Sequence, residues 1–385
     1  MVGGTGDVLF RSSPVVACLI DESQIGEHRR KRASRFLDAL FLYSFSLQIA
    51  SFGGVDMGKR LVVVVAVVFC MLGIGFSAFG AVRIGITQIV DHPALNSIYD
   101  GIIKALEDAG YKIGKDVIID RQNAQGNMQN AVAIARKFAS DKVDYAVAIA
   151  TLSAQACAQV ITDRPVVFSS VTDPVGAGLI KKLGKNTSNV VGISDMPPVE
   201  THLKLIKLVF PQARKIGVIY NPGEPNSVTI TNVAKEAASG LNLTVVDIPG
   251  TTPSEMIAAL NSIGPDVDVL YIGTDNTAAS SMEAIGKAAL RLKKPIVAAD
   301  IDIARNGAVL GFGFNYYQVG IETGKMLVQL LKGAKPQDLE SRLISPDSLM
   351  LYINLDVAKS LGVKVPADLV SRADILVQNG KEVVK

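Results

Sequence analysis

Short apolar segments alternate with amphipathic helical segments along the chain, and the whole alternation occurs twice. Strands that alternate with helices form parallel sheets with helices on both faces. The sequence therefore predicts an α/β fold of two doubly wound parallel-sheet lobes joined by a hinge, with a ligand cleft between the lobes. The expected strands are 82–87, 117–120, 145–150 and 165–169 in the first set, and 215–221, 243–247, 269–272 and 295–299 in the second.

The tail after residue 300 is expected to cross between the lobes. It contains two more strand-like segments, 307–314 and 349–353, with a helical segment at 317–331 between them. Repeated crossings of the chain form a hinge that permits closure on a ligand. On this basis the first lobe is expected to contain residues 82–194 and 301–334, and the second lobe residues 195–300 and 335–385.

The segment 57–80 has the pattern of a secretory signal peptide. Lys59 and Arg60 precede an apolar run, and small residues follow that run. The sequence therefore predicts an exported, periplasmic protein. An uncleaved membrane anchor is the alternative, because the apolar run approaches the roughly 20 residues that span a bilayer. Residues 1–56 precede this signal and are interpreted as an upstream extension that does not belong to the native protein.

Composition excludes several classes of function. The net charge is only +3, and no block of Lys or Arg follows residue 80, so nucleic acid is not an expected partner. Cys157 is the only cysteine after residue 80, which leaves no intramolecular disulfide in that part. His92 and His202 do not have a metal-ligand spacing, and no nucleophile elbow or phosphate loop occurs. We therefore expect no metal, no cofactor and no catalytic activity.

Polar residues follow the expected strands in both sets. Ligands of α/β lobes bind outside the carboxyl ends of the strands, so the loops that begin there contain the candidate ligand-binding residues. These residues are Thr87, Gln88, His92, Thr151, Ser153, Thr172 and Asp173 in the first set, Asn221, Glu224, Asn226, Ser227, Asp275, Asn276 and Asp300 in the second, and Asn315 and Tyr316 in the tail.

Two of these loops suit the two charges of an amino acid. The segment Thr151–Ser153 opens a helix, and the first-turn N–H groups and dipole of a helix favour a carboxylate. Asp275, at the corresponding edge of the other lobe, could pair with an ammonium group. Helix capping is the alternative for each residue alone, because Ser, Thr, Asp and Asn are the ordinary N-cap residues.

Five motifs occur in order between residues 82 and 365: Thr87–Leu95, Gln122–Gly126, Val171–Val175, Asn221–Ser227 and Asp275–Thr277. Together they resemble the ABC transporter substrate-binding family associated with tryptophan, phenylalanine and tyrosine uptake. The resemblance implies the type I periplasmic-binding fold, with two lobes joined by three crossings.

The same resemblance implies roles for individual residues. It implies that Thr151 and Ser153 hold the carboxylate of an amino acid. It also implies that Asp275 and Asn276 bind polar groups of the ligand, and that Glu224 and Asn226 line the second lobe. The chain departs from the family pattern at Leu152, where Pro is frequent, and at Asn315, where relatives often carry Asp.

The function that the resemblance implies is that of an exported solute-binding receptor of an ABC importer. It captures a small molecule by lobe closure and delivers it to a membrane permease and its ATPase. An amino acid, and among these an aromatic one, is the expected ligand, and the lack of Trp counts against a sugar. Carriers of this kind are usually monomers. A periplasmic ligand sensor for a chemoreceptor or kinase is one alternative. An exported enzyme is another, which the missing nucleophile–base pair disfavours.

Overall fold

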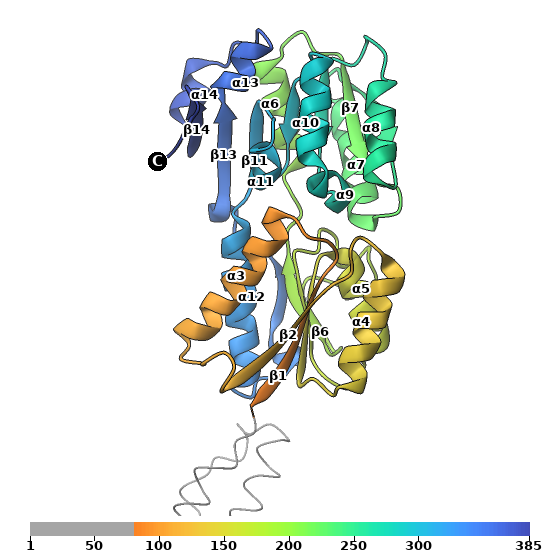
Figure 1. Ribbon diagram of the computed structural model, residues 1–385, viewed down its shortest axis with the longest axis vertical. Coiled ribbons are helices and arrows are strands. Elements are labelled where there is room, and N and C mark those ends of the chain that lie inside the picture. The colour runs from red at the N-terminus through yellow and green to blue at the C-terminus, as the bar shows by residue number, and fades with distance from the viewer. Residues whose placement is uncertain (1–80) are drawn as a thin grey trace, which may run out of the picture. The chain divides into compact units, whose positions relative to one another are not determined.

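The computed structural model describes residues 81–385, and both of its sheets belong to one compact unit of the chain (Figure 1). The expected signal peptide at 57–80 and the expected extension at 1–56 lie outside the described residues. No helix between residues 81 and 385 has the length and apolarity needed to cross a membrane.

The first sheet is mostly parallel. Its 7 strands have the order β2-β1-β3-β4-β6-β12-β5, and only the pairing of β12 with β5 is antiparallel. The strands are β1 (Val82–Gln88), β2 (Val117–Asn123), β3 (Tyr145–Ile149), β4 (Val166–Ser169), β5 (Gly184–Lys185), β6 (Val190–Ser194) and β12 (Glu340–Leu343).

The second sheet has 8 strands in the order β15-β14-β13-β11-β10-β9-β7-β8. Its central strands run parallel, and β11 pairs antiparallel with β13. The strands are β7 (Lys215–Tyr220), β8 (Thr244–Pro249), β9 (Val269–Ile272), β10 (Ile296–Ala298), β11 (Leu310–Phe314), β13 (Leu349–Asn354), β14 (Ile375–Gln378) and β15 (Lys381–Val384).

Helices cover both faces of each sheet, as the alternating pattern predicts. Figure 1 shows α3 and α12 on one side of the first sheet and α4 and α5 on the other. The helices of this part are α3 (Pro93–Asp108), α4 (Met128–Ser140), α5 (Thr151–Val160) and α12 (Tyr316–Leu331). Those of the second part are α6 (Val199–Val209), α7 (Pro225–Ser239), α8 (Pro253–Asn261), α9 (Asn276–Ser280), α10 (Met282–Arg291), α11 (Ile301–Ala304), α13 (Leu355–Ser360) and α14 (Ala367–Ser371).

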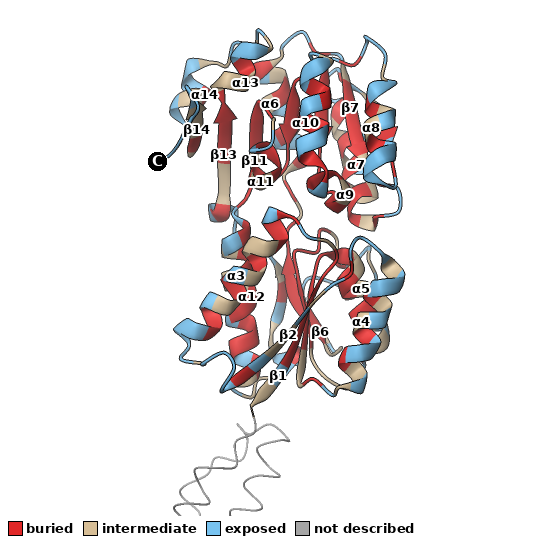
Figure 2. Ribbon diagram, in the orientation of Figure 1, coloured by how far each residue is buried: buried red, intermediate tan, exposed pale blue. Residues whose placement is uncertain are grey.

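The central strands are buried along their whole length, because helices cover them on both sides (Figure 2). Every residue of β4 and of β9 is buried. Continuous apolar runs such as these are typical of parallel strands inside α/β folds. Their rigid packing fixes the loops that begin at the carboxyl ends of the strands, and these loops form the candidate site described below.

Strand membership corrects the expected lobe ranges in two places. The range 301–334 was expected in the first lobe, yet β11 lies in the second sheet, parallel to β10 and antiparallel to β13. The range 335–385 was expected in the second lobe, yet β12 lies in the first sheet, parallel to β6. The hydrophobic pattern identifies β11 but does not say which sheet supplies its hydrogen-bond partners, and the polar sequence of β12 has no apolar run that would predict a strand.

Candidate functional site

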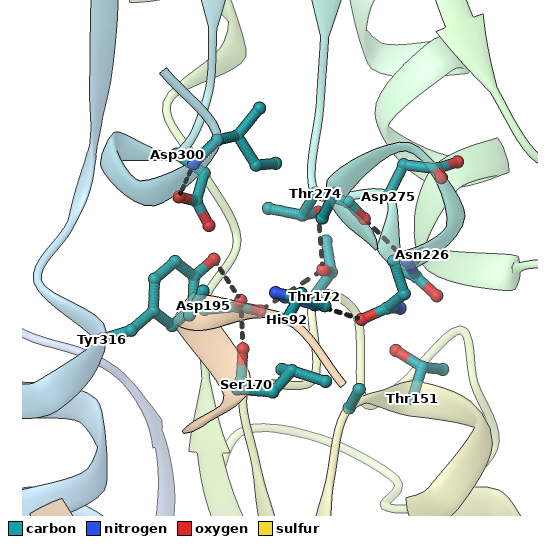
Figure 3. Close-up of a pocket in the computed structure, with 16 residues that line it drawn as sticks. His92, Thr151, Ser170, Thr172, Asp195, Asn226, Thr274, Asp275, Asp300 and Tyr316 are labelled. Atoms are coloured by element: carbon teal, nitrogen blue, oxygen red, sulfur yellow. Dashed lines mark hydrogen bonds between the residues drawn. The ribbon is translucent and has the colours of Figure 1, made fainter. Parts of the chain in front are cut away.

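A cavity with about 340 Å³ of empty volume lies where loops from both sheets meet. Its first-sheet side comes from the segments that follow β1, β3, β4 and β6, and its other side from α7 and the segments that follow β9, β10 and β11. Figure 3 shows the arrangement. The lining residues are His92, Ala94, Leu95, Ala150, Thr151, Ser170, Thr172, Asp195, Asn226, Thr274, Asp275, Asn276, Ala279, Asp300, Ile303 and Tyr316.

The N-terminus of α5 points a set of first-turn N–H groups toward this cavity. Thr151 is the first residue of the helix and lines the cavity, and Ala150 before it has a φ of 73°. A positive φ at a non-glycine residue is strained and occurs where a site needs it. The hydroxyl of Thr151 is buried and has no hydrogen-bond partner among the described residues. A free donor at a helix N-terminus suits an anionic group.

Asp195 places a buried carboxylate on the opposite side of the cavity. It follows β6, and it accepts hydrogen bonds from Ser170 Oγ at 2.5 Å, Tyr316 Oη at 2.9 Å and Thr172 Oγ1 at 3.3 Å. Burial raises the pKa of Asp195 above its ordinary value. No Lys or Arg forms an ion pair with it within residues 81–385. The hydroxyls orient this carboxylate but do not neutralise it.

Asp300 is a second buried carboxylate at this side of the cavity. It follows β10 and caps α11, where Oδ1 accepts from the Ile303 N–H at 2.9 Å. Burial, and next the charge of Asp302, raise the pKa of Asp300 to about 8. Asp195 adds to this effect, and no cation pairs with Asp300 in the described part of the chain. Two carboxylates therefore face a cavity without a cation.

Asp275, the expected ammonium partner, uses its oxygens in hydrogen bonds with the start of α9 and with the segment that follows β7. Its carboxylate accepts from the Ala278 N–H at 2.6 Å, from the Asn221 N–H at 2.6 Å and from the Ser227 hydroxyl. Burial, and next the charge of Glu224, raise its pKa. Asp275 lines the cavity, but both of its carboxylate oxygens already accept hydrogen bonds from protein groups, one of them as the N-cap of α9.

Glu224 has a similar internal role and does not line the cavity. Its carboxylate accepts from the Thr277 N–H at 3.0 Å and hydroxyl at 2.7 Å, and from the Asn276 N–H at 3.0 Å and amide at 2.6 Å. Glu224 thereby holds the loop between β9 and α9 in place, and it supports the cavity wall from behind.

His92 contributes a neutral imidazole to the cavity wall. Burial lowers the pKa of His92, and its Nε2 lies 3.4 Å from Asn276 Oδ1. Thr172 and Thr274 also meet, with 3.1 Å between their hydroxyl oxygens. Each of these two pairs joins a segment that follows a strand of the first sheet, β1 for His92 and β4 for Thr172, to the segment that follows β9.

The structure brings only part of the predicted residue set to the cavity. Those that line it are His92, Thr151, Thr172, Asn226, Asp275, Asn276, Asp300 and Tyr316. Those that do not are Thr87, Gln88, Ser153, Asp173, Asn221, Glu224, Ser227 and Asn315. Ligand contact therefore stays a prediction for the first group. Ligand contact stays a prediction for the second group as well, in which the buried hydroxyls of Thr87 and Ser153 have no hydrogen-bond partner among the described residues.

The second group shows what those side chains do instead. Gln88 donates to the Asn96 side chain and accepts from Arg121, and Asp173 accepts from the Gly176 N–H. Asn315 accepts from the Gln318 N–H at the start of α12. These are local capping and network roles, which the sequence analysis gave as the alternative to ligand contact.

Sequence reasoning did not select Ser170, Asp195 and Thr274 as site residues. Asp195 follows β6, a strand that was not predicted from the sequence. The residues after β6 were therefore not among the candidates at the carboxyl ends of strands. The sequence does contain a signal for this strand, because Val190–Ser194 is an apolar run that directly precedes Asp195. Among the described residues no cluster of His, Cys, Asp and Glu could hold a metal ion.

Comparison with known proteins places this geometry in a family. A tyrosine-binding protein of Clostridioides difficile is 41% identical over 74% of this chain and 83% of its own length. The structure of an ABC domain from Streptococcus pneumonia in complex with L-Trp is 33% identical, covers 78% of this chain and 100% of its own, and gives a TM-score of 0.74. A ligand-free, open substrate-binding protein with adhesive properties from Clostridium difficile is 40% identical over 77% of this chain and 99% of its own, with a TM-score of 0.60.

More distant solute-binding proteins share the two-sheet α/β architecture, which confirms the predicted type I periplasmic-binding fold. The family model described as "ABC transporter substrate binding protein" matches residues 83–377. The resemblance stated from the sequence motifs is thereby confirmed. The chain belongs to the ABC transporter substrate-binding proteins, a family of non-catalytic receptors.

Proposed function

We propose that this protein captures an aromatic amino acid in the cavity and delivers it to the permease of an ABC importer on the outer side of the membrane, in the periplasm. One observation carries the ligand class. Asp195 and Asp300 are buried, face the cavity and have no cation among the described residues. Ionising a buried carboxyl group is costly without a counter-charge, and a bound ammonium group removes that cost.

The opposite charge of the amino acid has a complementary partner. The first turn of α5 supplies free N–H groups, and the hydroxyl of Thr151 has no acceptor or donor partner in the described part of the protein. A carboxylate bound there accepts charge-assisted hydrogen bonds from the backbone. A zwitterion therefore supplies a counter-charge to the aspartates and an acceptor to the first turn of α5, whereas an uncharged sugar leaves the two carboxylates without a counter-charge.

The aromatic character of the ligand rests on the relatives and on the cavity wall. One relative is named a tyrosine-binding protein, and another structure holds L-Trp. The cavity wall also includes Leu95, Ala279 and Ile303, which present apolar surface to a side chain.

Thermal unfolding in the presence of single ligands tests the proposal. A ligand that binds only the folded protein stabilises it by about 2.7 kcal/mol at a hundredfold excess over Kd. We expect tyrosine and tryptophan to raise the unfolding midpoint. Glucose, ribose and tyramine, which is tyrosine without its carboxyl group, should leave the midpoint unchanged. A shift with a sugar, or equal shifts with tyramine and tyrosine, would contradict a zwitterion site.

A further inference from the structure

The side-chain amide of Asn226 has a fixed orientation at the cavity wall. Its Nδ2 donates to the carbonyl oxygen of Thr274 at 2.7 Å and to Glu224 Oε2 at 3.2 Å. Both partners are acceptors only, so the nitrogen and not the oxygen must face them. Rotation of the amide by 180° would place an acceptor against two acceptors, which excludes the alternative orientation.

This orientation leaves the amide oxygen without a partner. Asn226 is 4% exposed and lines the cavity, and its Oδ1 is buried with no hydrogen-bond donor among the described residues. Buried polar atoms in folded proteins nearly always have a partner, so one without a partner needs an explanation. A donor carried by the bound ligand supplies the missing hydrogen bond.

We propose that Asn226 is a specificity-determining residue, whose Oδ1 accepts a hydrogen bond from a donor on the aromatic side chain of the ligand. The donor is the phenol O–H of tyrosine or the indole N–H of tryptophan. Phenylalanine has no such group and is disfavoured. This inference rests on the proposed function, and it adds the group by which the site distinguishes one aromatic amino acid from another.

The other polar groups of an amino acid do not suit this oxygen. A carboxylate is an acceptor and repels Oδ1. An ammonium group bonds more strongly to a carboxylate than to a neutral amide oxygen. Asp195 and Asp300 supply the carboxylates, and in Figure 3 Asp300 and Tyr316 are drawn on the side of the cavity away from Asn226. The side-chain donor is the remaining group of the ligand that can reach Asn226.

A ligand series on the unmodified protein tests the proposal without a mutation. Calorimetric titration compares L-tyrosine with L-phenylalanine and with O-methyl-L-tyrosine, which keeps the oxygen but has no hydrogen to donate. We expect tyrosine to bind about 10- to 100-fold more tightly than either, because each of the other two leaves a buried acceptor unpaired. Equal affinities for tyrosine and phenylalanine would overturn the role of Asn226 while leaving the amino-acid site in place.

A variant pair then assigns the effect to this residue. Asn226→Leu removes the acceptor, so the ratio of the tyrosine and phenylalanine affinities should fall to near 1. Thr231→Val is the matched control: Thr231 lies on the same helix, is buried and bonds to the Ser227 carbonyl, but does not line the cavity. That variant should keep the wild-type ratio.

The outcomes separate the inference from the proposed function. An unchanged ratio in Asn226→Leu means that the donor bonds elsewhere, and this overturns the inference. A loss of affinity that is equal for both ligands assigns Asn226 to the shared part of the amino acid, which also overturns it. Failure of the wild-type protein to bind any aromatic amino acid overturns the proposed function together with the inference.

Discussion

Single residues set the charge of the cavity. Asp195 and Asp300 are held at this site by hydroxyl and N-cap hydrogen bonds, and burial raises the pKa of both carboxyls. Without a ligand, Asp300, whose pKa is about 8, carries a proton at neutral pH. A bound ammonium group favours the ionised form and lowers that pKa. Binding therefore releases a proton wherever the pH lies below the pKa of the empty site.

This linkage predicts a pH dependence of affinity. The affinity for tyrosine should rise as the pH increases from 6 to 8, by up to about tenfold per unit for one released proton, and level off above 8. Asp300→Asn should flatten this dependence and weaken binding by roughly 10- to 100-fold, because a charged partner is lost. Asparagine can still cap α11 at this position. Calorimetric titration at pH 6, 7 and 8 measures both effects.

Asp173→Asn is the control for that experiment. Asp173 was a predicted site residue, but it accepts from the Gly176 N–H and does not line the cavity. Its variant should keep the wild-type pH dependence. A wild-type affinity that does not change between pH 6 and 8 would contradict the assignment of the proton to Asp300.

His202 predicts a second pH effect, on stability. It is buried beside Tyr271, with 2.8 Å between Nδ1 and the Tyr271 oxygen, and burial lowers its pKa from 6.5 to about 4. A lowered histidine pKa stabilises the fold fully above pH 6.5 and loses that contribution as the pH falls from 6.5 to 4. The loss approaches roughly 3 kcal/mol.

Urea unfolding at pH 7, 6 and 5 measures this contribution. His202→Gln removes the titrating group, so the unfolding free energy of the variant should fall less steeply with acidification than that of the wild type. Parallel pH profiles for the two proteins would show that His202 titrates normally.

At the residue scale, a local sequence rule leads to some of the residues that line the cavity, whereas contacts between distant segments decide the position of others. His92, Thr151 and Asp300 follow identifiable strands, and the structure brings them to one cavity. Glu224 and Ser227 also lie in such a loop, yet their polar atoms bond to residues 48 to 53 positions away. Sequence shows that a side chain follows a strand. It does not show whether the side chain turns to the cavity or to the neighbouring loop.

At the scale of elements, α3 and α12 pack closely against each other. Cβ atoms built at Gly101 and Gly320 would lie 2.3 Å from the Tyr317 carbonyl oxygen and 2.1 Å from the Ile98 carbonyl oxygen. These are backbone atoms that cannot move aside alone. The chain enters α3 just after His92 and enters α12 at Tyr316, so this pair of helices positions two cavity residues.

Gly320→Ala should therefore destabilise the protein by about 1 to 3 kcal/mol, because overpacking pushes the two helices apart. Gly240→Ala is the matched control, since Gly240 ends α7 with a φ of −73° and has only the Ala237 carbonyl oxygen near its Cβ position, at 3.8 Å. That change should be neutral or slightly stabilising. Chemical denaturation measures both, and equal stability of the two variants would contradict the close approach.

Prediction of elements was more successful than prediction of their bounds. The apolar periodicity from residue 278 to residue 292 predicts one helix, whereas the structure has two, α9 and α10, which meet at Ser281. Ser281 has a φ of −112° and a ψ of 6°, outside the helical region. The apolar periodicity continues across this break, and only the backbone hydrogen bonds reveal it. The strand β6 was not identified, although its residues are all buried.

At the scale of the whole molecule, the repeated strand–helix pattern predicted the two α/β sheets, which the structure and the related folds confirm. The exchange of strands between the sheets could not be predicted. β11 is apolar like its neighbours and β12 is not, and the sheet to which each belongs is decided by long-range backbone pairing. The same crossings bring Tyr316 beside Asp195, although the two residues are 121 positions apart in the chain.

The central claim is that the cavity holds an aromatic amino acid, and the absence of tryptophan from the chain permits a direct measurement. Added L-tryptophan, free and bound, is then the only indole in the sample, so its emission reports the surroundings of the ligand without a tryptophan background from the protein. We predict a saturable blue shift of ligand emission as protein is added, reversed by excess L-tyrosine and strongly reduced in Asp300→Asn. Emission that stays at the wavelength of free tryptophan at all protein concentrations would contradict the account.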